Sequence, residues 1–461
     1  MVYFFYNFFL TLFLLLLTPY LFVRSLFDKP FRNALYQRLG CFPEFAPKGT
    51  IWFHAASVGE VFCSIPLARR LKAEFPHLPL VLTTMTATGN EMAKKSLPQA
   101  EAVLFFPLDQ SLLLGRMIKK IKPGLLLIAE TELWPNLFRV CGKKNIPLLL
   151  FNGRISDRSF PNYLFFRFFF RACLKYVSLF LMQTEKDRQR IIKIGASRER
   201  TRVVGNIKFD QEVSAISLEE RTALAQSLYL KGEEKIIIGG STHSGEEEIL
   251  CSLFKGLKET CSNLLLILAP RHLNRLEEVE GILNRMGLSW MKRTSFLPGQ
   301  SSSNRKRERP EVILLDTMGE LVKFYSLGTL IFIGGSLVPV GGHNPIEPLF
   351  YRKCVFFGPH MFNFLEISSL LVDTGGAIQV RGKEELASQW KDLLSDEKRC
   401  EEFGERGYQF LLRHRGATER MMKEIRPFLV QMRNAVGTTA RTVADSPGMG
   451  NYKQSQNSHD I

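Results

Sequence analysis

The chain has 461 residues, which is too long for one ordinary hydrophobic core and predicts two domains of roughly 100–200 residues each. An apolar content of 45% is typical of a globular protein and excludes a largely disordered chain. The formal net charge of +16 predicts attraction to a polyanion, which could be a nucleic acid or an anionic membrane surface. The cysteines form no CxxC pair and the histidines show no ligand spacing, so we expect reduced thiols and no metal site.

Residues 1–23 contain no charged side chain, and this length is sufficient for a helix that crosses a hydrocarbon core. The segment lacks the basic start and the small-residue cleavage site of a signal peptide. Arg24, Lys29, Arg32 and Arg38 follow it, and the positive-inside rule therefore places the rest of the chain in the cytoplasm. We expect residues 1–23 to be a single-pass anchor; a buried N-terminal helix of the globular part is the alternative.

From residue 30 onward, short apolar runs alternate with amphipathic stretches, which is typical of parallel sheets covered by helices on both faces. The alternation stops in a polar stretch after Asp210 and begins again at Lys235. Residues 50–71 and 235–257 share the order strand, small polar loop, Gly-Glu, helix. The predicted fold class is α/β, with two Rossmann-like domains at residues 30–210 and 211–433 that face each other across a cleft. Ligands of such sheets bind at the carboxyl ends of the strands.

Three segments lie outside this pattern. Residues 294–310 are Ser-rich and basic and predict an exposed loop, and the polar residues 434–461 predict a disordered tail. Residues 162–180 combine phenylalanines with Arg167, Arg171 and Lys175, which are about one helical turn apart. They predict either a helix in a membrane interface or a core helix whose basic side chains reach solvent.

Two glycine-rich stretches follow strands of the second half. Gly240–Gly245 begins like a P-loop, but Glu246 to Glu248 stand where the lysine would be and exclude a nucleotide triphosphatase; a single phosphate or a plain helix cap remains possible. Residues 331–348 contain four glycines and three prolines. We interpret this stretch as a binding loop in which Gly341 and Gly342 allow close approach of a ligand. A tight turn before a proline-started helix is the alternative.

Polar residues also end the apolar strands elsewhere. Glu130 and Glu132 follow one strand of the first half, and Lys208 lies close to the predicted domain junction. Arg271 ends a strand of the second half, where it could bind a phosphate or carboxylate. Either glutamate could instead be a charge favoured by a helix N-terminus, and a single lysine is usually just solvated.

The stretch HAASVGE, residues 54–60, contains Ser57-x-x-Glu60, the pattern of a capping box. A carboxylate at a helix N-terminus is stabilised as the anion, which is also what a general base requires. Capping and catalysis by Glu60 are therefore compatible.

Taken together, the chain resembles the family of transferases that attach 3-deoxy-D-manno-octulosonic acid (Kdo) to lipid A precursors. The motifs HAASVGE, AETELWPN, NGRISDRS, GNIKFD, LAPRH, DTMGE and GGHNPIEP carry this resemblance, in family order between about residues 50 and 350. The resemblance implies a metal-independent GT-B glycosyltransferase without a cofactor, which transfers Kdo from CMP-Kdo with inversion, in one or several successive transfers. Its N-terminal half would bind the lipid A precursor and its C-terminal half CMP-Kdo.

The resemblance also implies roles for individual residues. Glu60 would be the general base, and Glu130 and Lys208 would stabilise the transition state. The CMP-contacting positions would be Pro270, Arg271, Met318, Gly319, Glu320, Asn344, Pro345, Ile346 and Glu347. The enzyme would act at the cytoplasmic face of the inner membrane, where its positive charge suits a phosphorylated lipid and an anionic surface.

Two other functions are compatible with the same pattern. One is a membrane-associated GT-B glycosyltransferase that uses a UDP-sugar, and the other is a non-catalytic scaffold that binds nucleotide or lipid. Nucleic acid is not an expected partner, because the basic residues are dispersed and no nucleic-acid-binding motif occurs.

Overall fold

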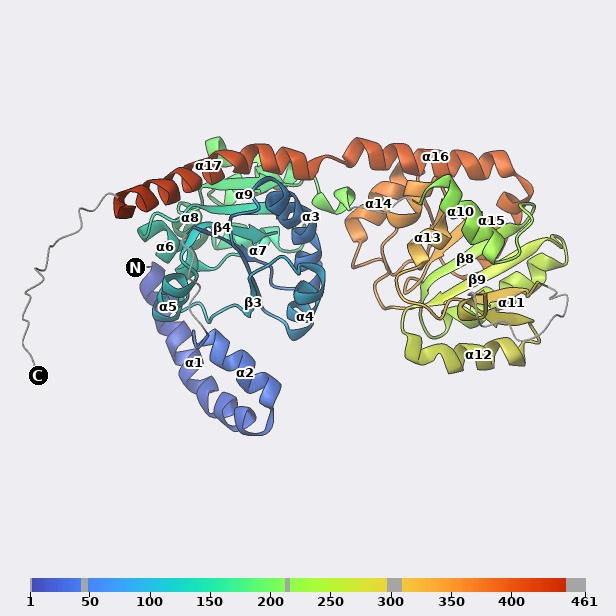
Figure 1. The fold of residues 1–461 in the computed structure, drawn as a ribbon, viewed down its shortest axis with the longest axis horizontal. Helices are drawn as coiled ribbons and strands as arrows, with labels where there is room; N and C mark the ends of the chain where they lie inside the picture. Colours follow the sequence, from blue (N-terminus) through green and yellow to red (C-terminus); the bar gives the residue numbers. More distant parts are fainter. Residues whose placement is uncertain (1, 43–48, 212–215, 297–308, 445–461) are drawn as a thin grey trace, which may run out of the picture. The chain divides into compact units, whose positions relative to one another are not determined.

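The structure, a computed structural model, describes residues 2–42, 49–211, 216–296 and 309–444, with side chains up to residue 432 of the last helix. The chain folds into two compact units (Figure 1). The first contains the chain up to Gln211 and again from Gly416 onward, and the second ends at Arg415.

The first unit is built on a parallel sheet of seven strands in the order β3-β2-β1-β4-β5-β6-β7. The strands are β1 (Thr50–His54), β2 (Leu80–Thr84), β3 (Ala102–Phe105), β4 (Pro123–Ala129), β5 (Leu148–Gly153), β6 (Leu179–Met182) and β7 (Thr201–Val203). The helices are α1 (Val2–Phe27), α2 (Lys29–Arg38), α3 (Val58–Glu74), α4 (Ala87–Ser96), α5 (Ser111–Ile121), α6 (Pro135–Lys143), α7 (Phe160–Phe165), α8 (Arg167–Leu174), α9 (Glu185–Ile194), η1 (Arg198–Arg200), η2 (Ile207–Asp210) and α17 (Ala417–Ala444). The strand order reverses between β1 and β4, and such a reversal is where doubly wound sheets bind ligands.

The second unit repeats this plan with a parallel sheet in the order β10-β11-β9-β8-β12-β13-β14, which confirms the predicted pair of Rossmann-like folds. Its strands are β8 (Lys235–Thr242), β9 (Leu264–Pro270), β10 (Trp290–Lys292), β11 (Val312–Leu314), β12 (Leu330–Ile333), β13 (Cys354–Phe357) and β14 (Ile378–Gln379). Its helices are α10 (Leu218–Ser227), α11 (Glu246–Lys258), η3 (Leu273–Arg275), α12 (Leu276–Arg285), η4 (Arg293–Phe296), α13 (Leu321–Tyr325), η5 (Glu347–Tyr351), α14 (Leu365–Asp373), α15 (Lys383–Ser395) and α16 (Glu397–His414). Here the order reverses between β8 and β12.

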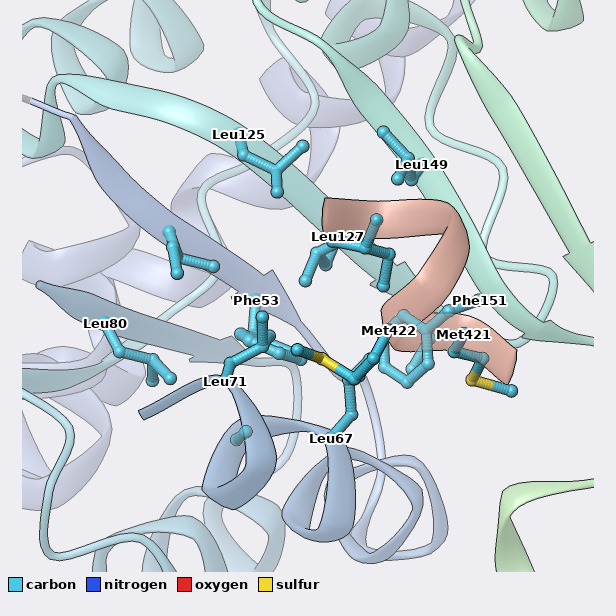
Figure 2. Packing of buried hydrophobic residues seen from close by; sticks show 14 of the residues in the cluster. Phe53, Leu67, Leu71, Leu80, Leu125, Leu127, Leu149, Phe151, Met421 and Met422 are labelled. Atoms are coloured by element: carbon cyan, nitrogen blue, oxygen red, sulfur yellow. The ribbon is translucent and has the colours of Figure 1, made fainter. Parts of the chain in front are cut away.

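Helix α17 belongs to the first unit, although the sequence assigned residues up to 433 to the second domain. Met421 and Met422 lie in the same core as Leu67 and Leu71 of α3 and the sheet residue Phe151 (Figure 2). The apolar side of α17 thus covers part of the first sheet. If the first unit ended near residue 210, that part of the sheet would be uncovered.

The carboxylate of Asp210 holds the start of α17 by accepting hydrogen bonds from the backbone N–H groups of Gly416 (2.6 Å) and Thr418. The predicted tail also begins later than expected, because α17 continues through residues 434–444. Residues 445–461 lie outside the described part of the chain, as do residues 297–308 of the predicted basic loop.

The segment 162–180 is not one continuous helix. It breaks at Phe166 into α7 and α8, and its last residues enter β6. Cys173 and Leu174 are buried, whereas Phe165 and Phe168 are 81% and 78% exposed. Three of its six phenylalanines, Phe165, Phe166 and Phe168, are exposed, whereas Phe169 and Phe170 pack against the core and Phe180 is buried. The segment is therefore partly core and partly surface.

Candidate functional site

Glu60 lies in the first turn of α3, which follows β1 at the carboxyl edge of the first sheet. Its carboxylate accepts hydrogen bonds from the backbone N–H of Ala56 (2.7 Å) and from the hydroxyl of Ser57 (3.0 Å). Ser57 is the N-cap of α3, as predicted, but its side chain accepts no hydrogen bond from the helix backbone. The predicted reciprocal capping box is therefore wrong. The carboxylate itself is the acceptor that organises the turn.

The surroundings of Glu60 raise its pKa to about 7. Burial is the largest cause, because the residue is only 8% exposed and its charged form loses hydration. The negative charges of Glu132 and Glu130 raise the pKa further, and the two hydrogen bonds oppose the shift. The expectation that the helix N-terminus keeps Glu60 fully ionised is therefore corrected. A carboxylate with a pKa near neutrality can both take up and release a proton at physiological pH.

Glu130 follows β4, the strand next to β1 across the reversal point. Its backbone adopts a left-handed conformation with φ of 53°, which costs a non-glycine residue of order 1–3 kcal/mol and is common at functional sites. The N–H of Glu130 remains bonded to the carbonyl of Phe151 at 2.9 Å, so the bend occurs directly at the end of the sheet.

Two cations flank the carboxylate of Glu130. The Nζ of Lys208 lies 3.7 Å from one oxygen and the Nε of Arg154 lies 3.5 Å from the other. The structure thus brings together all three residues that the sequence proposed for the first half, Glu60, Glu130 and Lys208. It adds Arg154 of the NGRISDRS motif, whose position beside Glu130 follows from the pairing of β4 with β5.

Asn152, near the end of β5, positions the short helix that carries Lys208. Its side-chain oxygen accepts a hydrogen bond from the N–H of Ile207 (3.0 Å), the first residue of the short helix η2 that carries Lys208. Asn152 is fully buried and has a left-handed φ of 54°, which asparagine tolerates better than most residues. Asn152 could not be selected from the sequence, because its partner lies 55 residues further along the chain.

In the second unit, Arg271 follows β9 and its side chain is exposed. The backbone of this residue is fixed by a hydrogen bond from its N–H to the carbonyl of Thr242 (3.0 Å). Burial raises the pKa of Glu347 to about 6, and the charge of Arg271 opposes that shift. Glu347 accepts a hydrogen bond from the amide of Asn344 (3.1 Å), whose oxygen binds the N–H of Ile346. Arg271 and the 344–347 segment therefore lie in one neighbourhood.

Glycines of the 331–348 stretch serve the protein's own packing. Gly341 and Gly342 have φ of 112° and 72°, and their N–H groups both bond to the carbonyl of Gly335. A Cβ at Gly341 would meet Asn363 at 2.4 Å, and one at Gly342 would meet Met361 at 2.2 Å. The prediction that these glycines make room for a ligand is wrong, because side chains of the chain itself occupy that room.

Glu246 explains why the P-loop-like stretch cannot hold a triphosphate. Its buried carboxylate accepts hydrogen bonds from the N–H groups of Gly335 (2.7 Å), Ser336 (2.9 Å), Leu337 (3.0 Å) and His243 (2.9 Å). Successive N–H groups of this kind form an anion-binding nest. Here an internal carboxylate already fills that nest.

The DTMGE segment follows β11. Met318 is exposed, and Gly319 has a φ of 86° that turns the chain toward α13. Glu320 accepts hydrogen bonds from Thr317 and from the buried Arg293 (3.4 Å). The segment is thus held by internal contacts and leaves Met318 and Gly319 open to solvent.

Three histidines surround the Arg271 neighbourhood and were not selected from the sequence. The Nε2 atoms of His243 and His343 lie 2.8 Å apart, with their rings nearly parallel, and the ring of His272 lies 5.6 Å from that of His243. Burial lowers the pKa of His343 to about 4, and Arg271 and the other two histidines lower it further. A neutral His343 can therefore share one proton with His243 in a hydrogen bond.

Two parallel Rossmann-like units, each with polar residues at the carboxyl edge where its strand order reverses, define a fold of the GT-B type. A solved glycosyltransferase from Rickettsia africae has a similar fold, with a TM-score of 0.53 and 13% identity over 83% of this chain and 98% of that one. The staphylococcal MnaA-UDP structure is similar too, with a TM-score of 0.50 and 16% identity over 83% and 97% of the two chains.

The sequence comparisons are more specific. Residues 33–211 match the family model described as 3-deoxy-D-manno-octulosonic-acid transferase. The chain is 35% identical to the 3-deoxy-D-manno-octulosonic acid transferase of Haemophilus influenzae over 86% of this chain and 90% of that protein. It is 31% identical to the enzyme of the same name from Rickettsia typhi over 82% and 79%. The chain belongs to the Kdo transferase family, and it is a glycosyltransferase of lipopolysaccharide biosynthesis.

Proposed function

We propose that this protein transfers Kdo from CMP-Kdo to a lipid A precursor with inversion at the anomeric carbon. The observation that carries the mechanism is the environment of Glu60, which combines a fixed carboxylate with a pKa of about 7. Such a group can accept the proton of an acceptor hydroxyl while that oxygen attacks the anomeric carbon of Kdo. The bond between that carbon and the phosphate oxygen breaks in the same step, and CMP leaves with the bonding electron pair.

Lys208 and Arg154 lie on either side of Glu130, and we propose that their positive charges stabilise the transition state of this step. The reaction moves negative charge toward the departing phosphate, and fixed cations in a partly buried site stabilise such charge without reorganising. Glu130 holds both cations in place, and its own charge helps to keep the pKa of Glu60 near neutrality.

We assign CMP binding to the second unit. Arg271 offers an exposed guanidinium that can bind a phosphate in a bidentate manner. Asn344 and Glu347 offer polar atoms for hydroxyl groups beside it, and the backbone around Met318 and Gly319 is open to solvent. The three histidines supply further ring nitrogens near the same phosphate position.

We further propose that the enzyme works at the cytoplasmic face of the inner membrane, held there by α1 and attracted by the anionic surface. This location supplies both a nucleotide-activated sugar and a lipid acceptor. We also propose that the enzyme needs no metal and no other cofactor. The positive charges of Lys208, Arg154 and Arg271 would take the place of a metal. Activity that survives a chelator would support it, and activity that requires an added divalent ion would contradict it.

The deciding experiment is incubation of the full-length protein with CMP-Kdo and a tetraacylated lipid A precursor, with the lipid products resolved by mass. The proposal requires addition of one or more Kdo masses together with release of CMP, and the product masses also count the transfers. Turnover of a UDP-sugar alone would replace the donor, and binding of CMP without its release from CMP-Kdo would indicate the non-catalytic scaffold. Glu60→Gln is the matched variant, because it preserves shape and most hydrogen bonding.

A further inference from the structure

The first turns of α1 are attached to the body of the first unit. The hydroxyl of Tyr3 donates to the carbonyl of Ala172 in α8 (3.2 Å), and the ring of Tyr3 lies beneath the guanidinium of Arg139 in α6. The amides of Asn7 and Asn136 exchange two hydrogen bonds of 3.2 and 2.7 Å. These contacts join residues more than 100 positions apart in the chain.

The contacts of Tyr6 and Asn7 complete a buried polar network. Asp109, which is 4% exposed, accepts hydrogen bonds from the N–H groups of Asn136 (3.0 Å) and Leu137 (2.9 Å) and from the hydroxyl of Tyr6 (2.8 Å). A buried carboxylate requires such donors to offset its lost hydration. The start of α1 therefore closes a network that belongs to the globular unit.

The contact side of α1 runs along the whole helix. Half-buried residues recur with the helical period, and the residues between them are exposed on the other sides. The half-buried series consists of Tyr3, Tyr6, Asn7, Leu10, Leu14, Leu17, Leu21 and Ser25. Toward its end, the helix lies against α2 (Figure 1). Leu17 and Leu21 there line a cavity together with Phe31 of α2 and Asn90 of α4.

This arrangement is incompatible with a helix that crosses a bilayer. If Arg24 marked the cytoplasmic boundary, Asn7 would lie about 26 Å deeper, at 1.5 Å per residue, within a hydrocarbon core of about 30 Å. The partners of Asn7 and Tyr6 include the ionisable Asp109 and the nearby Arg139, which would then also lie in hydrocarbon. Both ends of α1 must instead lie on the side of the globular unit.

The outward sides of α1 nevertheless require an apolar partner. Phe4, Phe5, Phe8, Phe9 and Leu16 are among its exposed residues, and the segment from Val2 to Val23 has no charge. The ring of Tyr6 contacts that of Phe169 in α8, with the ring centroids 5.8 Å apart. The exposed Phe165, Phe166 and Phe168 of the α7–α8 segment are therefore close in the chain to a residue that touches α1. Basic Arg167, Arg171 and Lys175 are exposed beside them. Exposed aromatic rings interspersed with cations fit the interface of an anionic bilayer.

We infer that α1 is an in-plane membrane anchor, which lies in one leaflet of an anionic bilayer together with α7 and α8 and does not cross it. Insertion of the α1–α2 pair with its turn foremost is disfavoured, because Arg24, Asp28, Lys29 and Arg32 lie at that turn. The in-plane topology is an alternative to the single-pass anchor predicted from the sequence. The inference rests on the proposed membrane attachment, but it does not depend on Kdo transfer.

A photo-cross-linking experiment tests the contact in membranes. A benzophenone amino acid replaces Tyr3 in one full-length protein and the exposed Phe5 in a matched control. The inference requires that the probe at position 3 cross-links to the peptide containing Arg139 or the one containing Ala172 in the same chain, and that the probe at position 5 cross-links to lipid. Lipid products alone at both positions would overturn it, and so would a covalent dimer formed from position 3.

Thiol labelling tests the topology independently. Val2→Cys and, as a reference on the globular unit, Lys95→Cys are placed in a protein whose Cys41 and Cys261 are replaced by serine. We expect a membrane-impermeant maleimide to label both positions only in inside-out vesicles of the inner membrane. Labelling of position 2 only in right-side-out vesicles would overturn the inference. Failure of the protein to sediment with membranes would refute the attachment as well, whereas lost Kdo transfer with unchanged labelling would refute only the proposed function.

Discussion

The pKa of Glu60 leads to a quantitative prediction for the pH dependence of transfer. A general base works in its ionised form, so kcat/KM is expected to rise with pH and to level off above about 7. One pH unit below that pKa about a tenth of Glu60 is ionised, and activity at pH 6 should be about tenfold below the plateau. Glu60→Gln should lose about 10²- to 10⁴-fold in activity at every pH, because an amide accepts no proton.

Glu132→Gln provides the control that separates this cause from others. The charge of Glu132 is the second largest cause of the raised pKa of Glu60, after burial. Its removal should shift the midpoint of the pH profile toward acid, so that this variant loses less activity at pH 6 than the parent protein does. The assay is the initial rate of CMP release over about pH 5 to 9 at lipid acceptor concentrations well below KM, where the rate is proportional to kcat/KM. An unchanged midpoint in Glu132→Gln, or a fully active Glu60→Gln, would refute the assignment of Glu60 as the base.

The same pKa predicts how stability depends on pH. The folded-state pKa of Glu60 is above its ordinary value of 4.5, so the folded protein binds this proton more tightly than the unfolded chain. Ionisation of Glu60 therefore costs nothing below pH 4.5 and reduces stability progressively between pH 4.5 and about 7, by about 3 kcal/mol in total. Glu60→Gln should consequently be no less stable than the parent to urea at pH 8. A markedly lower urea midpoint would show that the carboxylate is needed for folding.

Three further substitutions test the remaining site residues. Lys208→Met should lower kcat by about 10²- to 10³-fold with little change in KM, since it removes a fixed charge beside Glu130, and a changed KM alone would instead indicate a binding role. Asn152→Gly keeps the left-handed backbone at φ 54° but leaves the buried N–H of Ile207 unpaired, so kcat should fall and stability should drop by about 1–3 kcal/mol, and unchanged kcat would show that η2 holds Lys208 without it. Arg271→Ala should weaken CMP binding, measured by calorimetry, by about 2 kcal/mol, and unchanged affinity would place the phosphate elsewhere.

The fold was predictable because its signal is local and repeated. Continuous apolar strands followed by amphipathic helices indicate parallel sheets, and the matching starts at residues 50 and 235 indicate two of them. The positions of Glu130 and Arg271 at strand ends were readable for the same reason. The return of α17 to the first unit was not, since nothing in its own amphipathic pattern specifies which sheet it covers.

Within the site, properties that depend on distant neighbours could not be predicted. The pattern Ser57-x-x-Glu60 indicates a helix start, but the pKa of Glu60 depends on burial and on Glu132, some 70 positions away. In the same way, the glycines at 341 and 342 signal close approach but not what approaches, which proved to be Asn363 and Met361. Sequence spacing identifies the residue types, whereas their charge states and partners depend on the completed packing.

The attachment of α17 to the first unit has a consequence for biogenesis. Helix α17, which covers part of the first sheet, follows the whole second unit in the chain, so this part of the sheet stays exposed while the second unit is synthesised. A chain truncated near residue 415 would retain every proposed catalytic residue yet expose the apolar surface that Met421 and Met422 cover. Separate production of the first unit therefore requires residues up to 211 joined to residues 416–444, whereas the second unit is one continuous stretch of the chain.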